Sequence, residues 1–402
     1  MDDVLYLVHR IPFPPNKGDK IRSFHILKHL AERYSVHLGT FVDDPIDNQY
    51  IQELVPFVAS KQVLPLSSKA RRLASIKGLL NGKPLSEVYY ECQPMQEWVD
   101  STIHRYSIKK CLVFSSQMAQ FVIGHRQLKR VMDFVDVDSE KWFQYAQKKP
   151  FPFNWVYARE GRTLRTLESR VNDDFDGSLF VSEQEAELFR QKISSNRERV
   201  QAMSNGVDMS YFDPDFDNTA PVSPYKEEAK DAKILVFTGA MDYWANIEAV
   251  QWFCDEIFPA VREKVSEARF YIVGARPADS VLSLMNQKGV VVTGSVKDVR
   301  PYLKYATVAV APLRIARGIQ NKVLEALSME KIVVATPEAL EGIIHQENGQ
   351  SVALTAPNKS EYIRLLVDQL NASDRIINSF ARQYVQQHFS WQSHLSLLET
   401  LL

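Results

Sequence analysis

The chain has 402 residues, 45% of them hydrophobic and 24% charged, which is the composition of a soluble globular protein with two domains. Its 48 basic and 49 acidic residues leave a formal net charge of −1, so no general attraction to nucleic acid or to an anionic membrane follows. Three widely spaced cysteines, Cys92, Cys111 and Cys254, argue against a disulfide framework and against a zinc knuckle.

Strand and helix signals alternate through the first half of the chain. Residues 4–8 form an apolar run typical of a buried strand, and a proline-rich loop follows it up to Gly18. A helix is predicted next, because apolar residues recur at helical spacing from Ile21. This alternation indicates a parallel sheet covered by helices. Further strands are predicted at 36–42, 62–66, 110–114, 130–135 and 177–181, with an acidic helix from Ser182.

Residues 211–231 break this pattern and predict a linker, because they combine three prolines with polar residues and little apolar periodicity. The alternation then restarts, so two Rossmann-like domains are expected at 1–210 and 232–388, in an α/β fold. The last residues, 389–402, predict one amphipathic helix. The second domain has predicted strands at 233–238, 268–273, 289–293, 308–311 and 331–335, and helices at 246–264, from 277 and at 318–329.

The segment 308–335 carries the most chemistry. After its first strand, a loop places Arg314 and Arg317 just before Gly318, where a helix is expected to begin. A helix N-terminus attracts phosphate through its free N–H groups and its positive dipole end. Lys322 and Glu325 then share one helix face, where a lysine can hold a diphosphate and a carboxylate can accept two ribose hydroxyls. An ordinary βαβ unit with a solvated basic loop is the alternative.

The pattern 311–326, APLRIARGIQNKVLEA, resembles the nucleotide-sugar site of family 4 glycosyltransferases. It is most similar to the sugar transferases of bacterial exopolysaccharide and exosortase (PEP-CTERM) gene clusters. The resemblance implies the GT-B fold, with two Rossmann-like domains facing across a cleft and the tail helix 389–402 packing back on the first. It also implies a retaining reaction, a nucleotide-diphosphate sugar as donor, and neither a cofactor nor a metal ion.

Other segments match the same family. Gly239 follows a predicted strand and allows a ligand to approach the backbone. Ile319 belongs to the expected nucleotide site, and the backbone near Val296 would pair with the nucleobase. The turn Asn205–Gly–Val–Asp208 resembles the family's turn before the linker, with a structural role.

The sequence departs from the family at two places. The family carries a Glu-x7-Glu motif, whose second member matches Glu325 and whose first falls on Arg317. The family's basic pair after the first strand of this domain is replaced by Ala240 and Asn246. We therefore expect Arg317, together with Lys322 and Arg314, to supply the charge that meets the diphosphate.

The first domain offers two candidate positions. Gly18, in Lys17–Lys20, resembles the family's glycine loop that faces the diphosphate or acceptor. Asp136 and Asp138 follow a predicted strand, at the end where ligands bind in open α/β folds. We expect them to contact the acceptor or the donor sugar, with Asp136 among the catalytic residues. The alternative is that one of them only caps the next helix.

Together these features predict a metal-independent glycosyltransferase acting on a glycan or lipid-linked acceptor in polysaccharide biosynthesis, with no nucleic-acid partner. Two alternatives are a non-hydrolysing nucleotide-sugar epimerase and a degenerate nucleotide-sugar-binding subunit of an assembly complex. The N-terminus is not typical of a signal peptide, and no apolar run approaches the ~18 to 20 residues of a membrane span. A cytoplasmic protein is therefore expected. The basic amphipathic segment 67–80 predicts a peripheral contact with the inner face of the membrane. The alternative is an ordinary solvated helix.

Overall fold

The structure is a computed structural model that describes residues 1–15, 18–66, 82–147, 150–216, 223–226, 228, 231–316, 319–343, 346–347, 349–372 and 378–402. The chain divides into two compact units. Unit 1 comprises Met1–Asn205 and His394–Leu402, and unit 2 comprises Gly206–Ser393. Within the described residues, no helix is both long and apolar enough to cross a bilayer.

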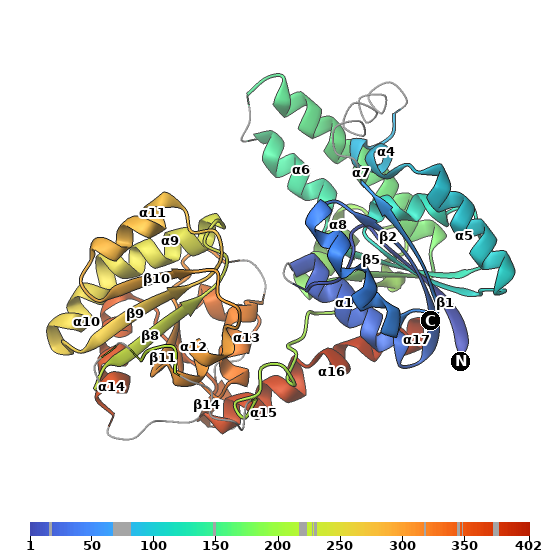
Figure 1. Ribbon diagram of the computed structural model, residues 1–402. Coiled ribbons are helices and arrows are strands. Elements are labelled where there is room, and N and C mark those ends of the chain that lie inside the picture. The colour runs from blue at the N-terminus through green and yellow to red at the C-terminus, as the bar shows by residue number, and fades with distance from the viewer. Residues whose placement is uncertain are drawn as a thin grey trace. The chain divides into compact units, whose positions relative to one another are not determined.

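Unit 1 is built on a seven-stranded sheet in the order β3-β2-β1-β4-β5-β6-β7, in which every neighbouring pair is parallel (Figure 1). Its central strands are apolar runs that are buried on both faces, as parallel strands covered by helices must be. The strands are β1 (Asp2–Val8), β2 (Tyr34–Val42), β3 (Ser60–Pro65), β4 (Lys110–Phe114), β5 (Lys129–Val135), β6 (Gly177–Phe180) and β7 (Val200–Ala202).

Helices cover both faces of this sheet. On one face the Tyr6 hydroxyl donates to the backbone oxygen of Ser23 in α1, at 3.1 Å. On the other face, α5, α7 and α8 share one hydrophobic core with the sheet. The helices of unit 1 are α1 (Gly18–Ala31), α4 (Leu85–Tyr90), α5 (Gln93–Arg105), α6 (Asp138–Gln147), α7 (Phe153–Asp174), α8 (Glu183–Lys192) and α17 (Leu397–Leu401), with 3₁₀ segments η1 (Pro45–Phe57), η2 (Ser116–Phe121) and η3 (Arg197–Arg199).

Unit 2 contains a six-stranded parallel sheet in the order β10-β9-β8-β11-β12-β15, and a short antiparallel pair lies apart from it. The two Rossmann-like domains expected from the sequence are thus confirmed. The strands of unit 2 are β8 (Lys233–Thr238), β9 (Ala268–Val273), β10 (Val290–Gly294), β11 (Val308–Ala311), β12 (Val333–Ala335) and β15 (Leu354–Thr355), with β13 (Gln346–Glu347) and β14 (Gln350–Ser351) as the pair.

The helix expected at 246–264 is divided by a π-helical turn, η4 (Phe253–Ile257). Pro259 follows directly in the first turn of the next helix, and a proline without an N–H disrupts α-helical bonding there. The helices of unit 2 are α9 (Trp244–Trp252), α10 (Phe258–Lys264), α11 (Asp279–Leu282), α12 (Arg300–Tyr305), α13 (Asn321–Ser328), α14 (Lys359–Asn371) and α15 (Ser379–His388), with η5 (Ser283–Asn286) and η6 (Glu338–Leu340); α16 (Trp391–Leu395) spans the boundary at Ser393.

Two expected helix boundaries were wrong. The helix predicted from Gly318 begins at Asn321, because Gln320 has an extended backbone with φ −89° and ψ 102°. The tail predicted as one helix over 389–402 forms two short helices, α16 and α17. Phe389 and Ser390 are not helical because Val207 pairs with them, its N–H donating to the Phe389 carbonyl at 2.7 Å.

Candidate functional site

In each unit the strand order reverses beside the first strand, and ligands of open α/β sheets bind at the carboxyl ends of the strands at such a point. In unit 2 the reversal lies between β8 and β11, followed by Gly239 and by the loop that leads to α13. In unit 1 it lies between β1 and β4, followed by His9 and Ser115. Each unit therefore has its own candidate site at these strand ends.

Glycines at the ends of β8 and β9 permit a close approach of two chain segments. A Cβ at Gly274 would lie 1.6 Å from the carbonyl oxygen of Gly239. A Cβ at Gly239, whose φ is +156°, would lie 2.8 Å from Nδ2 of Asn246 and 3.3 Å from Cε of Lys322. The small residues therefore let the α9 and α13 side chains reach the end of β8.

Lys322 reaches across this point from the first turn of α13. Its Nζ donates to Oδ1 of Asn246 at 3.0 Å, and lies 5.4 Å from the centroid of the Phe237 ring. Asn246 is held in turn, because its Nδ2 donates to the Ala240 carbonyl at 2.8 Å. Nζ also lies 3.5 Å from Oε1 of Gln320. The ammonium group thus has two neutral acceptors and an aromatic face nearby, and its third N–H remains for an anion.

Glu325 lies one turn further along α13. Among the residues that the structure describes, none donates a hydrogen bond to its carboxylate. Both side chains keep part of their surface open but are crowded by protein atoms. Burial therefore raises the pKa of Glu325 to about 7, against the effect of Lys322. Burial likewise lowers the pKa of Lys322 to about 8, against the effect of Glu325.

The other unit 2 residues predicted for the site occupy different settings. The guanidinium of Arg314 pairs with Glu248 of α9, its Nε lying 2.8 Å from Oε1, and it stacks over Trp252 with 5.1 Å between Cζ and the ring centroid. Val296 and Ile319 are partly buried and pack against the core of unit 2. A ligand would therefore compete with Glu248 for Arg314.

Several predicted residues fall outside the described part of the chain. Arg317, Gly318 and Lys17 are among them, and so is the basic segment 67–80. The phosphate role expected for Arg317 and Gly318 stays a prediction from the sequence.

The acidic segment at the C-terminal end of β5 has three carboxylates, Asp133 within the strand and Asp136 and Asp138 after it. Asp133 is fully buried, and its two oxygens accept from Nε and Nη2 of Arg22 at 2.8 and 3.1 Å. Asp136 and Asp138 instead share Lys141, whose Nζ lies 2.6 and 3.4 Å from their oxygens. Burial raises the pKa of Asp138. Asp133 therefore ties β5 to α1, and the other two remain near the strand end.

Neither Asp136 nor Asp138 caps α6 through a described residue, so the alternative reading finds no support. The Val137 N–H donates to Glu185 at 2.8 Å, and the Ser139 N–H donates to Glu168 at 3.0 Å. The first donors of the helix are thus satisfied from α8 and α7. Within the described residues, no cluster of three or more His, Cys, Asp and Glu side chains could hold a metal ion.

The backbone at the ends of β4 and β5 adopts an uncommon conformation. Ser115 has a φ of 76° and Val135 a φ of 71°. Positive φ costs of order 1–3 kcal/mol in a non-glycine residue, and such strain gathers at functional sites. This agrees with the place of the unit 1 candidate site at these strand ends.

His9, at the end of β1, was not singled out by the sequence. Its ring stacks on Phe114 with 5.8 Å between centroids, and Nε2 lies 3.5 Å from Asp19. Its Nδ1 is buried and has no hydrogen-bond partner among the residues that the structure describes. The signal that could have found it is a histidine directly after a buried strand. Gly18 begins α1 as expected, but Asp19 already places a carboxylate in the first turn, which opposes a phosphate there.

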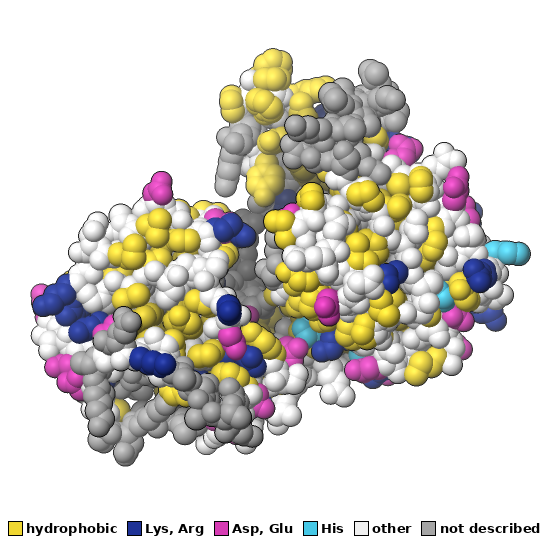
Figure 2. All heavy atoms as spheres, viewed as in Figure 1, with side chains coloured by type: hydrophobic (Ala, Val, Ile, Leu, Met, Phe, Trp, Pro, Cys, Tyr) yellow, Lys and Arg dark blue, Asp and Glu magenta, His cyan; other side chains and the backbone are white. Residues whose placement is uncertain are grey.

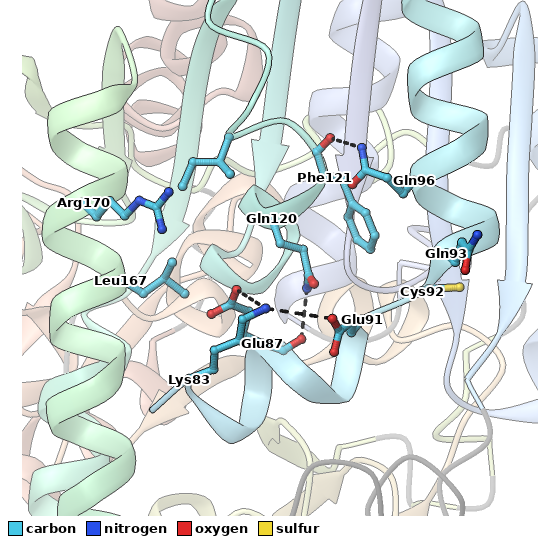
Figure 3. Close-up of a pocket in the computed structure, with 11 residues that line it drawn as sticks. Lys83, Glu87, Glu91, Cys92, Gln93, Gln96, Gln120, Phe121, Leu167 and Arg170 are labelled. Carbon is cyan, nitrogen blue, oxygen red and sulfur yellow. Dashed lines mark hydrogen bonds and ion pairs between the residues drawn. The ribbon is translucent and has the colours of Figure 1, made fainter. Parts of the chain in front are cut away.

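A pocket of about 410 Å³ lies elsewhere in unit 1, between α5 and α7 (Figure 3). Lys83 lies 3.9 Å from both Glu87 and Glu91, so these charges balance one another. The amide of Gln120 donates to the backbone oxygens of Glu87 and Gln117. Because its wall is built by helices rather than strand ends, we do not assign the candidate site to it.

Comparison with known proteins places residues 232–371, within unit 2, in the family described as Glycosyl transferases group 1. No curated protein matches the chain in sequence. Unit 2 therefore carries a glycosyltransferase group 1 domain.

Solved structures show the same fold over the whole chain. Sucrose-phosphate synthase from Thermosynechococcus elongatus is 16% identical with a TM-score of 0.65, covering 100% of this chain and 98% of its own. Anabaena HepE in complex with UDP-glucose is 15% identical with a TM-score of 0.65, covering 100% and 99%. WaaG, a glycosyltransferase involved in lipopolysaccharide biosynthesis, is 14% identical with a TM-score of 0.61, covering 99% of both chains. These likenesses establish the GT-B fold.

Proposed function

We propose that this protein is a retaining glycosyltransferase. It moves a sugar from a nucleotide-diphosphate sugar to a glycan or lipid-linked acceptor in polysaccharide biosynthesis. The observation that carries the proposal is the Lys322–Glu325 pair at the strand-order reversal of a glycosyltransferase group 1 domain. One side chain has a spare donor and the other an acceptor without a described partner, as a nucleoside diphosphate requires.

The chemistry follows from where charge develops. Breaking the bond between the anomeric carbon and the phosphate oxygen leaves negative charge on the diphosphate. Lys322 would stabilise that charge, because a donor fixed in a poorly hydrated site acts most strongly on the transition state. The sequence predicts the same role for Arg317. Glu325 would hold the ribose hydroxyls. The leaving phosphate can take the acceptor proton, so the reaction needs no side-chain nucleophile.

The acceptor side is proposed to lie in unit 1. Asp136 and Asp138 would bind acceptor or donor-sugar hydroxyls, and His9 supplies the nearby unpartnered ring nitrogen. The proposal further includes metal-independent action in the cytoplasm, with a peripheral membrane contact. The similarity to exopolysaccharide and exosortase-associated transferases supports the pathway assignment.

The test is a thermal-shift and calorimetric screen of nucleoside diphosphates and their sugars, beginning with UDP and UDP-glucose because HepE is known with both. A ligand at one hundred times its Kd should stabilise the protein by ~2.7 kcal/mol. Lys322→Ala should lose turnover by ~10²–10³ while its unfolding temperature stays unchanged. Lys359→Ala is the matched control, because Lys359 pairs with Glu256 on the surface of unit 2. Normal turnover in Lys322→Ala would remove Lys322 from the mechanism.

A degenerate nucleotide-sugar-binding subunit is the second candidate, favoured by Arg317 where the family has a glutamate. The epimerase alternative needs a dedicated acid and base, and the sequence offers no convincing set. The products formed from the nucleotide sugar separate the three candidates. A transferase releases nucleotide when acceptor is added, a non-hydrolysing epimerase converts the nucleotide sugar into its epimer without net release of nucleotide, and a binding subunit does neither.

A further inference from the structure

The α6–α7 hairpin of unit 1 carries an unusual concentration of exposed aromatic residues. We call Tyr145, Phe151, Phe153 and Trp155 the aromatic tip, and they are 53%, 80%, 56% and 53% exposed. The two helices extend away from the sheet of unit 1 in Figure 1, and Figure 2 shows hydrophobic side chains gathered over their far end. Exposed apolar groups in such a cluster mark an interaction surface.

The hairpin has inner contacts of its own, and two of the four tip side chains also touch it: the ring centroids of Tyr145 and Trp142 lie 6.1 Å apart, and those of Phe153 and Tyr157 lie 6.5 Å apart. Its two helices pack closely where Gly161 lies against the ring of Phe143, since a Cβ on Gly161 would be only 3.0 Å from that ring. Nearer the tip, Trp142 and Tyr157 contact each other with 5.1 Å between ring centroids. These inner residues fix the helices, so the exposed rings are available for a partner.

Charge indicates what that partner is. Residues 141–159 contain four basic residues, Lys141, Lys148, Lys149 and Arg159, and no aspartate or glutamate, although the chain as a whole has a net charge of −1. Arg159 is buried and Lys141 pairs with Asp136 and Asp138, so the excess positive charge is that of Lys148 and Lys149. Lys148 and Lys149 fall between the two helices in sequence, outside the described residues. Aromatic rings beside basic residues are the composition that enters the interface of an anionic bilayer.

We propose that the aromatic tip inserts into the headgroup region of an anionic lipid bilayer and holds unit 1 at the membrane surface. The inference deepens the proposed function, on which it rests for its purpose, because an enzyme held there would meet a lipid-linked acceptor. The segment 67–80 is a separate basic feature of the sequence and is not needed for this insertion.

The test is co-sedimentation of the full chain with vesicles of phosphatidylcholine alone or mixed with phosphatidylglycerol. We expect binding to the mixed vesicles only, and the triple variant Phe151→Ser, Phe153→Ser, Trp155→Ser should bind about tenfold or more weakly. The matched control is Ile46→Ser with Val55→Ser, which replaces two other exposed hydrophobic residues of unit 1, 67% and 49% exposed. This control should bind vesicles like the unmodified protein.

Unchanged vesicle binding by the triple variant would overturn the proposal. It would indicate the basic segment 67–80 as the membrane contact instead. Absence of binding by the unmodified chain would overturn it too, as would an equal loss in the control. If light scattering instead shows a dimer that the triple variant dissociates, the tip binds a second copy and the proposal is wrong. Stabilisation by the nucleoside diphosphates of the screen is measured on every sample. Vesicle binding without binding of any nucleoside diphosphate in the screen would contradict the proposed function but keep the tip, and nucleotide binding without vesicle binding would do the reverse.

Discussion

At the scale of single residues, Lys322 and Glu325 are ionisable groups whose pKa values are moved toward each other. Burial lowers the first to about 8 and raises the second to about 7. Burial thus disfavours the charged form of both side chains in the unliganded protein. This is expected of groups whose charges are stabilised by a bound ligand.

The first prediction concerns pH. Lys322 is charged below about pH 8 and Glu325 is charged above about pH 7, so affinity for a nucleoside diphosphate should be greatest between these values. It should fall on the acid side as Glu325 gains a proton and on the alkaline side as Lys322 loses one. Calorimetry with UDP from pH 6 to about pH 9.5 measures this, and Lys322→Arg should lose the alkaline limb because arginine stays protonated.

The second prediction separates binding from folding at Glu325. Glu325→Gln removes a carboxylate that is crowded by protein atoms and has no described donor. Nucleotide affinity should fall by ~1.5–3 kcal/mol, as for a hydrogen bond to a charged group. The unfolding temperature without ligand at pH 8 should stay equal or rise, since the folded state no longer holds a poorly solvated charge. A large drop in that temperature would assign Glu325 a structural role instead.

The third prediction concerns His9. His9→Phe preserves an aromatic ring on Phe114 while removing both ring nitrogens, including the unpartnered Nδ1. We expect kcat/KM to fall by about tenfold or more, the effect of losing one good polar contact with the reacting groups. The melting temperature should change little. Normal kcat/KM in a well-folded variant would leave His9 as a packing residue of unit 1.

At the scale of elements, the ends of β8 and β9 depend on a contact that only glycine allows. Gly274→Ala would place a methyl group 1.6 Å from the Gly239 carbonyl oxygen, and this neighbour is backbone that cannot rotate away. We expect a loss of about 2 kcal/mol or more in unfolding free energy, together with weaker nucleotide binding, because Gly239 adjoins Lys322. Chemical denaturation measures the loss. Gly124→Ala is the control, since its Cβ would meet no atom within 4 Å.

Strands could be predicted from the sequence better than the site could. The bounds of β4, β8, β9 and β11 follow from apolar runs, which are local signals. The Lys322–Glu325 face of α13 was equally local, because it needs only helical spacing. In contrast, Arg314 lies 66 residues from Glu248 in the sequence, and Lys322 lies 76 from Asn246. Local sequence patterns do not predict contacts between residues so far apart in the chain. The tail helix was misjudged for the same reason, since Val207 fixes Phe389 from far away.

At the scale of the molecule, the chain passes twice between the units, after Asn205 and after Ser393. The first of these connecting segments is held at its unit 1 end by Arg22. The Nη1 group of Arg22 donates to Oδ1 of Asn205 at 3.0 Å. On the unit 2 side, a Cβ at Gly206 would lie 2.4 Å from the Trp391 nitrogen, so the two passing segments touch there. The turn ends as expected, with Asp208 accepting from the N–H groups of Ser210 and Tyr211 at 3.2 and 3.1 Å.

Residues 394–402 contribute packing to unit 1 from the other end of the sequence. Leu398 and Leu402 are buried, and Glu399 pairs with Arg33 of α1 at 2.8 Å. Deleting 394–402 should therefore lower the unfolding temperature of unit 1 while unit 2 keeps its UDP affinity. Differential scanning calorimetry and calorimetric titration measure the two effects. An unchanged first transition would show that this segment contributes nothing to unit 1.

Unit 1 is formed from two separate segments of the chain, and this affects how the protein folds during synthesis. Domains generally fold one after another as the ribosome extends the chain, with the N-terminal domain first. Here the N-terminal unit lacks residues 394–402 until the ribosome has passed through the whole of unit 2, because these residues follow Ser393 in the sequence. Unit 2 can complete its sheet earlier. Folding of the nascent first domain therefore stays incomplete during this time. The surface that Leu398 and Leu402 later cover remains accessible to chaperones.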